Sequence, residues 1–143
     1  MTKSIFVNLP VADVATATAF YTALGFERNP TFSDDHKASS MVWSDAITVM
    51  LLHRDFYATF TDKEIIDAHR QSGALLCLSF DDRATVDAFA KAAMGAGGSE
   101  LHGAEDHGFM YSRAVADPDG HGWQAMTMDM AAFEAMKAAP AAA

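Results

Sequence analysis

The chain has 143 residues, the size of one domain built around one hydrophobic core. Hydrophobic residues make up 50% of it and charged residues 20%, a balance that excludes wholesale disorder. With 19 acidic residues against 10 basic ones the formal charge is -9, so nucleic acid and anionic membranes would be repelled and we expect neither as a partner.

The single cysteine, Cys77, excludes an internal disulfide and a CxxC motif. No apolar run approaches the roughly 18 residues of a membrane span, and the first residues lack the apolar centre of a signal peptide. A cytoplasmic protein with a small-molecule ligand is therefore the expectation.

The first part of the chain predicts a βαβββ unit. Residues 3–11 are rich in β-branched and aromatic side chains and predict a strand, and Asp13 can cap the helix that follows. Apolar residues at helical spacing mark a helix over 14–24, which Gly25 ends. Three strand-like stretches separated by turn residues come next, at 26–32, 40–43 and 47–52.

The same pattern then begins again, at a constant offset of 69 residues in its opening strand and helix. Residues 75–82 lie over residues 6–13, and Phe89 takes the place of Phe20. We expect a single domain at 1–130, which contains module one at about 3–57, a linker helix at about 61–72 and module two at about 73–128. An Ala-rich tail at 131–143 follows it and is expected to be helical as far as Pro140.

Three features together resemble the vicinal-oxygen-chelate superfamily, the group of glyoxalases, bleomycin-resistance proteins and dioxygenases. They are the strand and Asp13 helix that closes in FYTALGF at 20–26, the DPDGH turn at 117–121, and the duplicated βαβββ plan. The resemblance implies an α+β fold in which two modules with curled mixed sheets form a cup, with helices outside. Its enzymes hold a divalent metal in that cup, and its metal-free members bind small molecules there.

The resemblance also places four metal-ligand positions in this chain, at Phe6, Met50, Leu75 and Gln124. Three of these four side chains have no oxygen or nitrogen donor, and a hard divalent cation needs several. We therefore expect no metal and no other cofactor.

A second candidate metal or acid–base cluster is formed by His102, Glu105, Asp106 and His107, which we expect to lie in a loop. A solvated loop is the favoured interpretation, because spacing alone does not specify ligand geometry. His107 stands near Tyr111 where a strand begins, so it is also a candidate general base at the mouth of the cup.

Strand alternation predicts which side chains line the cup. If Phe6 faces the cup, then so do Asn8 and Pro10, and the second module presents its counterparts. The predicted ligand-binding set is mainly apolar with a few polar points: Phe6, Asn8, Met50, Leu75, Cys77, Gln124 and Met126. Alternatively, the amides of Asn8 and Gln124 hydrogen-bond each other or water inside a filled core.

The sequence does not decide which residues of the strand over 109–116 face the cup. One register turns Ser112 inward with Met110 and Ala114, whereas a bulge would present Tyr111 and Arg113, and Arg113 could then pair with an anionic group. Cys77 stands between leucines, which is typical of an inert buried thiol rather than a nucleophile.

Three functions compete. The first is a metal-independent protein that binds a small, largely apolar molecule, and the second is a metal-dependent lyase or dioxygenase with a non-standard site. The third is a structural or regulatory subunit with a vestigial cup. A homodimer is expected in each case, because so small a curled sheet leaves edges and apolar surface to cover.

Overall fold

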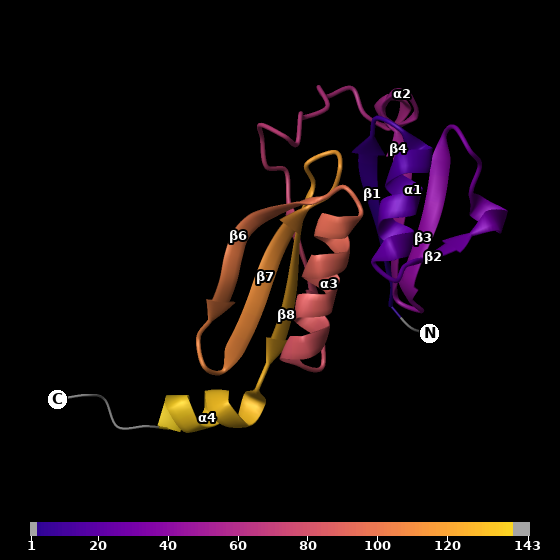
Figure 1. The fold of residues 1–143 in the computed structure, drawn as a ribbon. Coiled ribbons are helices and arrows are strands. Elements are labelled where there is room, and N and C mark those ends of the chain that lie inside the picture. The colour runs from indigo at the N-terminus through magenta and orange to yellow at the C-terminus, as the bar shows by residue number, and fades with distance from the viewer. Residues whose placement is uncertain (1–2, 139–143) are drawn as a thin grey trace.

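The structure is a computed structural model that describes residues 3–138. It consists of two βαβββ modules, a linker and a C-terminal helix (Figure 1). No helix within that described range is long and apolar enough to cross a membrane.

The first module is a four-stranded mixed sheet with one long helix. Its strand order is β1-β4-β3-β2, with β1 parallel to β4 and the other pairs antiparallel. Its elements are β1 (Ile5–Val11), α1 (Val14–Ala23), β2 (Glu27–Asn29), β3 (Ala38–Ser44) and β4 (Ile47–His53).

The second module repeats this plan with the order β5-β8-β7-β6. Its elements are β5 (Leu75–Ser79), α3 (Arg83–Gly95), β6 (Ser99–Asp106), β7 (Met110–Ala116) and β8 (Gly122–Met128). Helix α4 (Met130–Ala138) then extends from the end of β8, held by the ring of Phe133 against that of Phe109. The expected end of this helix at Pro140 lies outside the described residues.

Residue pairing confirms the predicted α+β duplication in detail. Asn8 of β1 lies opposite Met50 of β4, and Cys77 of β5 lies opposite Gln124 of β8. The predicted helix signals are confirmed too. The carboxylate of Asp13 accepts hydrogen bonds from the first turn of α1, and Gly25 has φ +104°, a conformation that favours glycine at a helix end.

The stretch over 26–32, predicted as one strand, is a strand only at Glu27–Asn29. A 3-10 helix, Pro30–Phe32, follows it. Pro30 has no N–H to donate to a sheet, and the side chain of Asn29 caps the 3-10 turn.

The predicted linker helix is wrong. The chain forms a short α2 (Arg54–Tyr57) and a 3-10 helix (Ala58–Phe60), and then runs irregularly to the start of β5. Side chains form hydrogen bonds with backbone N–H and C=O groups that would pair with each other in a helix. The Arg54 guanidinium donates to the carbonyls of Ile65 and Ile66, and the Gln71 side chain accepts the Asp67 N–H.

The helix-bearing faces of both sheets share one core. Trp43 of β3 packs edge-on against Phe80 of the second module, with ring centroids 5.7 Å apart, and Tyr21 of α1 packs against Trp123 of β8 at 5.8 Å. Helix α3 accordingly lies between the second sheet and the first module in Figure 1. The opposite face of each sheet takes no part in this core.

A buried hydrogen-bond cluster fastens the modules to each other. The Tyr21 hydroxyl donates to Asp117 Oδ2 at 2.6 Å and accepts from Trp123 Nε1 at 2.8 Å. Asp117 Oδ1 accepts from the backbone N–H groups of Asp119 and His121, both at 2.9 Å. Burial raises the pKa of Tyr21 well above its usual value, so the phenol stays a donor.

Replacing Tyr21 with Phe tests this cluster. The change leaves Asp117 Oδ2 and the Trp123 N–H without partners in a dry site, so we expect the free energy of unfolding to fall by about 1–3 kcal/mol. The matched control is Tyr111→Phe, which removes another 2.6 Å phenol–carboxylate bond, to the half-exposed Asp87. There water replaces the lost partner, and the loss should stay below about 1 kcal/mol. Equal losses in urea denaturation would contradict the assigned role.

Candidate functional site

In the first module, the face of the sheet turned away from α1 carries the predicted lining residues. Phe6, Asn8 and Met50 share it, because Asn8 pairs with Met50 and Phe6 lies two residues before Asn8. Phe6 is 63% exposed, and the Asn8 side chain is exposed as well. This face is therefore open around Phe6 and Asn8 in the single chain, whereas Ser40 and Leu52 on the same face are buried.

The second module presents the equivalent face. Leu75, Cys77 and Gln124 lie on it. Met126 lies on the same face, two residues after Gln124 in β8. Leu75 is 58% exposed, and Gln124 and Met126 are half-buried. The two open faces, defined by Phe6, Asn8 and Met50 and by Leu75, Cys77, Gln124 and Met126, are called the cup faces below.

The register of β7 decides between the two frames left open by the sequence. Pairing with β8 is regular over the whole strand and sets Ser112 opposite Met126, on the cup face. Tyr111 and Arg113 point the other way, toward α3, so their candidate place in the cup is wrong. The Tyr111 hydroxyl donates to Asp87 at 2.6 Å, and Arg113 pairs with Asp87 at 3.4 Å and Glu100 at 3.3 Å.

Asn8 and Gln124 do not form the structural amide pair that was the alternative. They lie on different sheets, and neither side chain makes a hydrogen bond within residues 3–138. Partial desolvation raises the pKa of the Cys77 thiol, which keeps it protonated at neutral pH and makes it a poor nucleophile.

The histidine and acidic cluster is on the edge strand of the second sheet rather than in a loop. His102 and Glu105 lie on β6, which the sequence analysis did not place, and His107 lies in the turn before β7. Glu105 stands 3.6 Å from a ring nitrogen of each histidine. All three are well exposed, and among the described residues no three His, Cys, Asp or Glu side chains are grouped to hold a metal.

Neighbouring Asp106 is engaged elsewhere. It forms a two-pronged ion pair with Arg83, at 2.6 and 2.9 Å, which lowers the pKa of Asp106 to about 2. His107 sits at the hairpin tip with its ring beside Phe109, so it does not share the cup face with Gln124. These positions do not support His107 as the general base of the cup.

The metal-ligand positions named by the resemblance do not fit a divalent cation. Phe6 and Leu75 offer only hydrocarbon and Met50 only a weakly binding thioether, which leaves the Gln124 amide as the single oxygen donor. No reaction step through a metal at these positions follows from this donor set.

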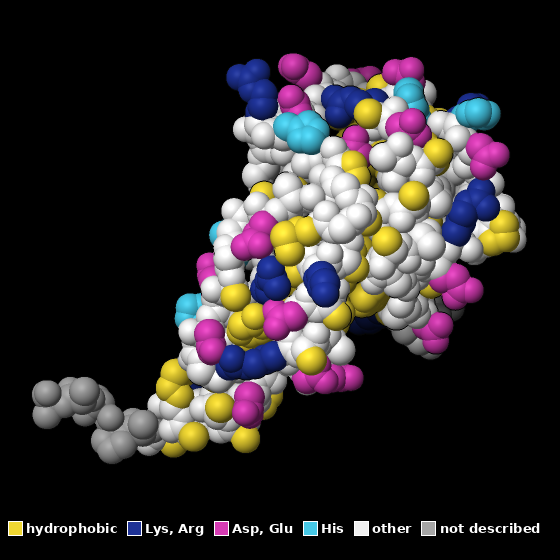
Figure 2. All heavy atoms as spheres, in the orientation of Figure 1, with side chains coloured by type: hydrophobic (Ala, Val, Ile, Leu, Met, Phe, Trp, Pro, Cys, Tyr) yellow, Lys and Arg dark blue, Asp and Glu magenta, His cyan; other side chains and the backbone are white. Residues whose placement is uncertain are grey.

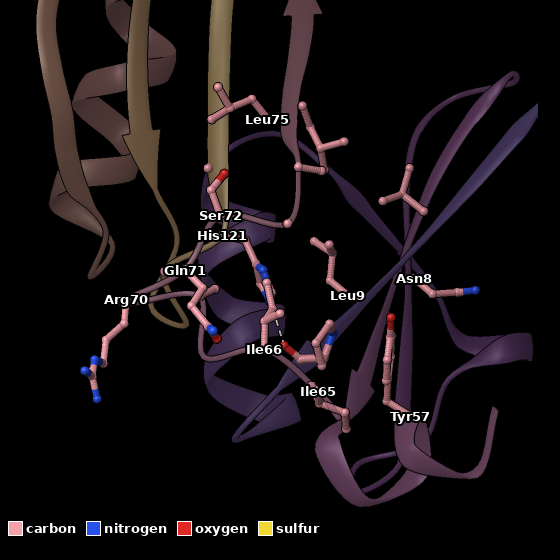
Figure 3. Close-up of a pocket in the computed structure, with 18 of the residues that line it drawn as sticks. Asn8, Leu9, Tyr57, Ile65, Ile66, Arg70, Gln71, Ser72, Leu75 and His121 are labelled. Carbon is pink, nitrogen blue, oxygen red and sulfur yellow. Dashed lines mark hydrogen bonds between the residues drawn. The ribbon is translucent and has the colours of Figure 1, made fainter. Parts of the chain in front are cut away.

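Sequence reasoning gave His121 no role beyond its place in the DPDGH turn. The ring is half-buried, and Nε2 donates to the carbonyl of Pro10 at 2.7 Å, the dashed line in Figure 3. The carboxylate of Asp119 accepts the next N–H along this edge, from Ala12, at 2.9 Å. The sequence feature that could have indicated this role is the DPDGH turn, whose polar residues bind the end of β1.

A crevice of about 640 Å³ lies between the edge of β1, the start of β5 and the irregular linker (Figure 3). The sequence could not indicate it, because its outer wall is the segment that was predicted as a helix. Its lining is mostly apolar with a few polar groups and includes Leu9, Pro10, Tyr57, Ile65, Ile66, Gln71, Ser72, Leu75, Leu101 and His121.

Charged side chains show no single grouping on the face seen in Figure 2. Acidic and basic residues are interspersed there, with hydrophobic side chains between them. Two arginines of the second module are paired with carboxylates, Arg83 with Asp106 and Arg113 with Asp87.

Comparison with known proteins gives a short family match and many structural matches. Residues 3–36 match the family model described as bleomycin resistance protein-like N-terminal. No curated protein matches the chain.

Among solved structures, a hypothetical protein from S. aureus is similar with a TM-score of 0.74 and 22% identity, covering 89% of this chain and 94% of the other. A glyoxalase/bleomycin resistance protein/dioxygenase family enzyme from Burkholderia phytofirmans has a TM-score of 0.72 and 16% identity, covering 89% and 99%. A lactoylglutathione lyase from Agrobacterium tumefaciens has a TM-score of 0.66 and 17% identity, covering 89% and 94%.

The structural neighbours share the two-module architecture over nearly the whole chain, and the family match covers the first strand and helix. The resemblance found in the sequence is thereby confirmed, and this chain has the fold of the vicinal-oxygen-chelate superfamily of glyoxalases, bleomycin-resistance proteins and dioxygenases.

Proposed function

We propose that this protein binds a small, largely apolar molecule on its cup faces without a divalent metal, and that a second copy of the chain completes the binding cup. The observation that carries the proposal is the exposure of Phe6 and Leu75. These two residues occupy ligand positions of the metal-using relatives, and here they are apolar side chains open to solvent in the single chain.

The second copy is inferred from the way in which one chain packs. Its core joins the helix-bearing faces of the two sheets, so its own two cup faces do not cover each other. Contiguous exposed apolar surface marks interaction sites in soluble proteins. The exposed apolar residues on or beside the cup faces are Phe6, Leu75, Leu101 and Met128.

The chemistry of the cup faces suits a small organic molecule. Met50 and Met126 supply flexible apolar walls that adapt to different shapes. Asn8 and Gln124 supply side-chain amides that have no hydrogen-bond partner between residues 3 and 138. Apolar area then provides affinity, and the amides orient the ligand.

Elemental analysis tests the metal-independent part. After dialysis, we expect less than about 0.1 equivalent of Zn, Ni, Mn or Fe per chain, because one amide cannot repay the dehydration of the ion. About one equivalent per chain that disappears in Gln124→Ala would contradict the proposal. That result would favour the metal-dependent lyase or dioxygenase instead.

Sedimentation equilibrium tests the second copy. A carboxylate buried without a partner at an interface is costly, so Phe6→Asp should shift the protein from dimer to monomer at micromolar concentration. Phe60→Asp is the matched control, because Phe60 is 67% exposed but lies in the 3-10 helix Ala58–Phe60, outside both sheets. A monomeric parent at high micromolar concentration, or equal effects of the two variants, would overturn the dimer.

Asn8→Leu and Gln124→Leu test the role of the amides. Neither side chain has a hydrogen bond to lose within the described part of the chain, so the free energy of unfolding should change by less than about 0.5 kcal/mol. The stabilisation by a compound selected from a thermal-shift panel on the parent should weaken, with affinity reduced about 5- to 100-fold by each change. Large stability losses with unchanged affinity would favour a vestigial cup.

A further inference from the structure

The free edge of β1 is partly bound by side chains of the second module. The Ile5 N–H donates to the Ala46 carbonyl in the parallel ladder with β4, so the odd-numbered residues of β1 direct their peptide groups toward β4. Those of Phe6, Asn8 and Pro10 therefore point to the open side. His121 binds the carbonyl of Pro10 there, and Asp119 binds the N–H of Ala12.

The next peptide groups along this edge are the N–H and C=O of Asn8, and the ladder gives them no partner. Asn8 lines the crevice through its backbone, because its side chain points away from Ile66 and His121 in Figure 3. One donor and one acceptor thus stand side by side at the wall of the crevice. A trans secondary amide points its N–H and C=O in opposite directions, so one amide binds one of these two groups. Two successive amides, as in an added strand, bind both.

The rest of the crevice wall is chiefly hydrocarbon. Leu9, Ile66 and Leu75 line it, and the hydroxyl of half-buried Tyr57 has no hydrogen-bond partner among the described residues. The volume of about 640 Å³ is in the range of small-molecule sites.

The charged residues of the lining give no preference for an ionic ligand. Lys63 and Glu64 are of opposite sign, and Arg70 points away from the other labelled side chains in Figure 3. An uncharged ligand therefore fits this site better than a carboxylate does.

We infer that the crevice between β1, β5 and the linker is a second ligand site, which takes a small apolar molecule carrying a secondary amide. The amide N–H donates to the C=O of Asn8, and the apolar body lies against Leu9, Ile66 and Leu75. The site differs from the cup faces in its outer wall, which is the linker of the same chain, although Leu75 and Asn8 border both.

The test is a pair of titrations followed by ¹H–¹⁵N correlation spectra of the full chain. N-benzylacetamide and benzyl acetate differ at one position, where the amide has an N–H group and the ester has an oxygen atom. We expect the amide to shift the backbone signals of Asn8, Gly73 and Leu75 at concentrations up to about 20 mM, and the ester to bind about five-fold more weakly. N-acetyl-leucine methylamide, titrated alongside, shows whether a peptide or a non-peptide amide binds more tightly at the same residues.

Two variants separate this site from the cup. Ile66→Trp fills the crevice and should abolish the shifts, and Gln124→Leu alters the cup face and should leave them unchanged. Equal affinity for amide and ester, shifts confined to Cys77 and Gln124, or no shift at Asn8 would overturn the inference. The spectra of the parent protein locate the binding residues directly, so the test of the crevice site does not depend on how well the Ile66→Trp variant folds. A failure to bind ligand at the cup faces alone would leave the crevice inference unchanged.

Discussion

The hydrogen bond from Tyr21 to the buried carboxylate of Asp117 holds the two modules in the arrangement on which both proposed sites depend. Tyr21 belongs to the first helix and Asp117 to the turn before the last strand, so one 2.6 Å contact joins the two halves of the chain. Burial raises the pKa of Asp117, and two backbone N–H groups and the phenol compensate that carboxylate. The cluster aligns the helix-bearing faces of the two sheets and leaves the cup faces outside.

The turn that contains Asp117 also joins the two modules at the surface. Residues just after Asp117 bind the end of the β1 edge through His121 and Asp119, and Gly120 lies so close to the linker backbone at Ala68 that a Cβ there would stand 2.6 Å from it. Only glycine, with φ +93° here, fits this approach. The turn thus fastens α1, β1 and the linker together, and the crevice is the space that remains between them.

The parts of the structure that the sequence could predict are those set by local pattern and by duplication. Alternation along β1 and the 69-residue offset placed Asn8 and Cys77 on equivalent faces, and both lie there. The linker was mispredicted because its apolar and polar spacing suits a helix, whereas a guanidinium distant in sequence, that of Arg54, binds its carbonyls. Which faces of the two sheets meet is decided by tertiary contacts such as Trp43 against Phe80, and no local pattern encodes those.

Cys77 offers the most direct measurement of whether two copies close a cup, because it is the only cysteine and lies exposed on a cup face. The rate of its reaction with a water-soluble thiol reagent can be followed as the protein concentration rises across the range of dimer formation. If a second copy covers the cup face, the rate constant should fall by at least about ten-fold, since the reagent then reaches the sulfur only in the dissociated fraction. A rate constant that does not change across that range, while sedimentation reports a dimer, would show that the copies meet elsewhere and would contradict the shared cup.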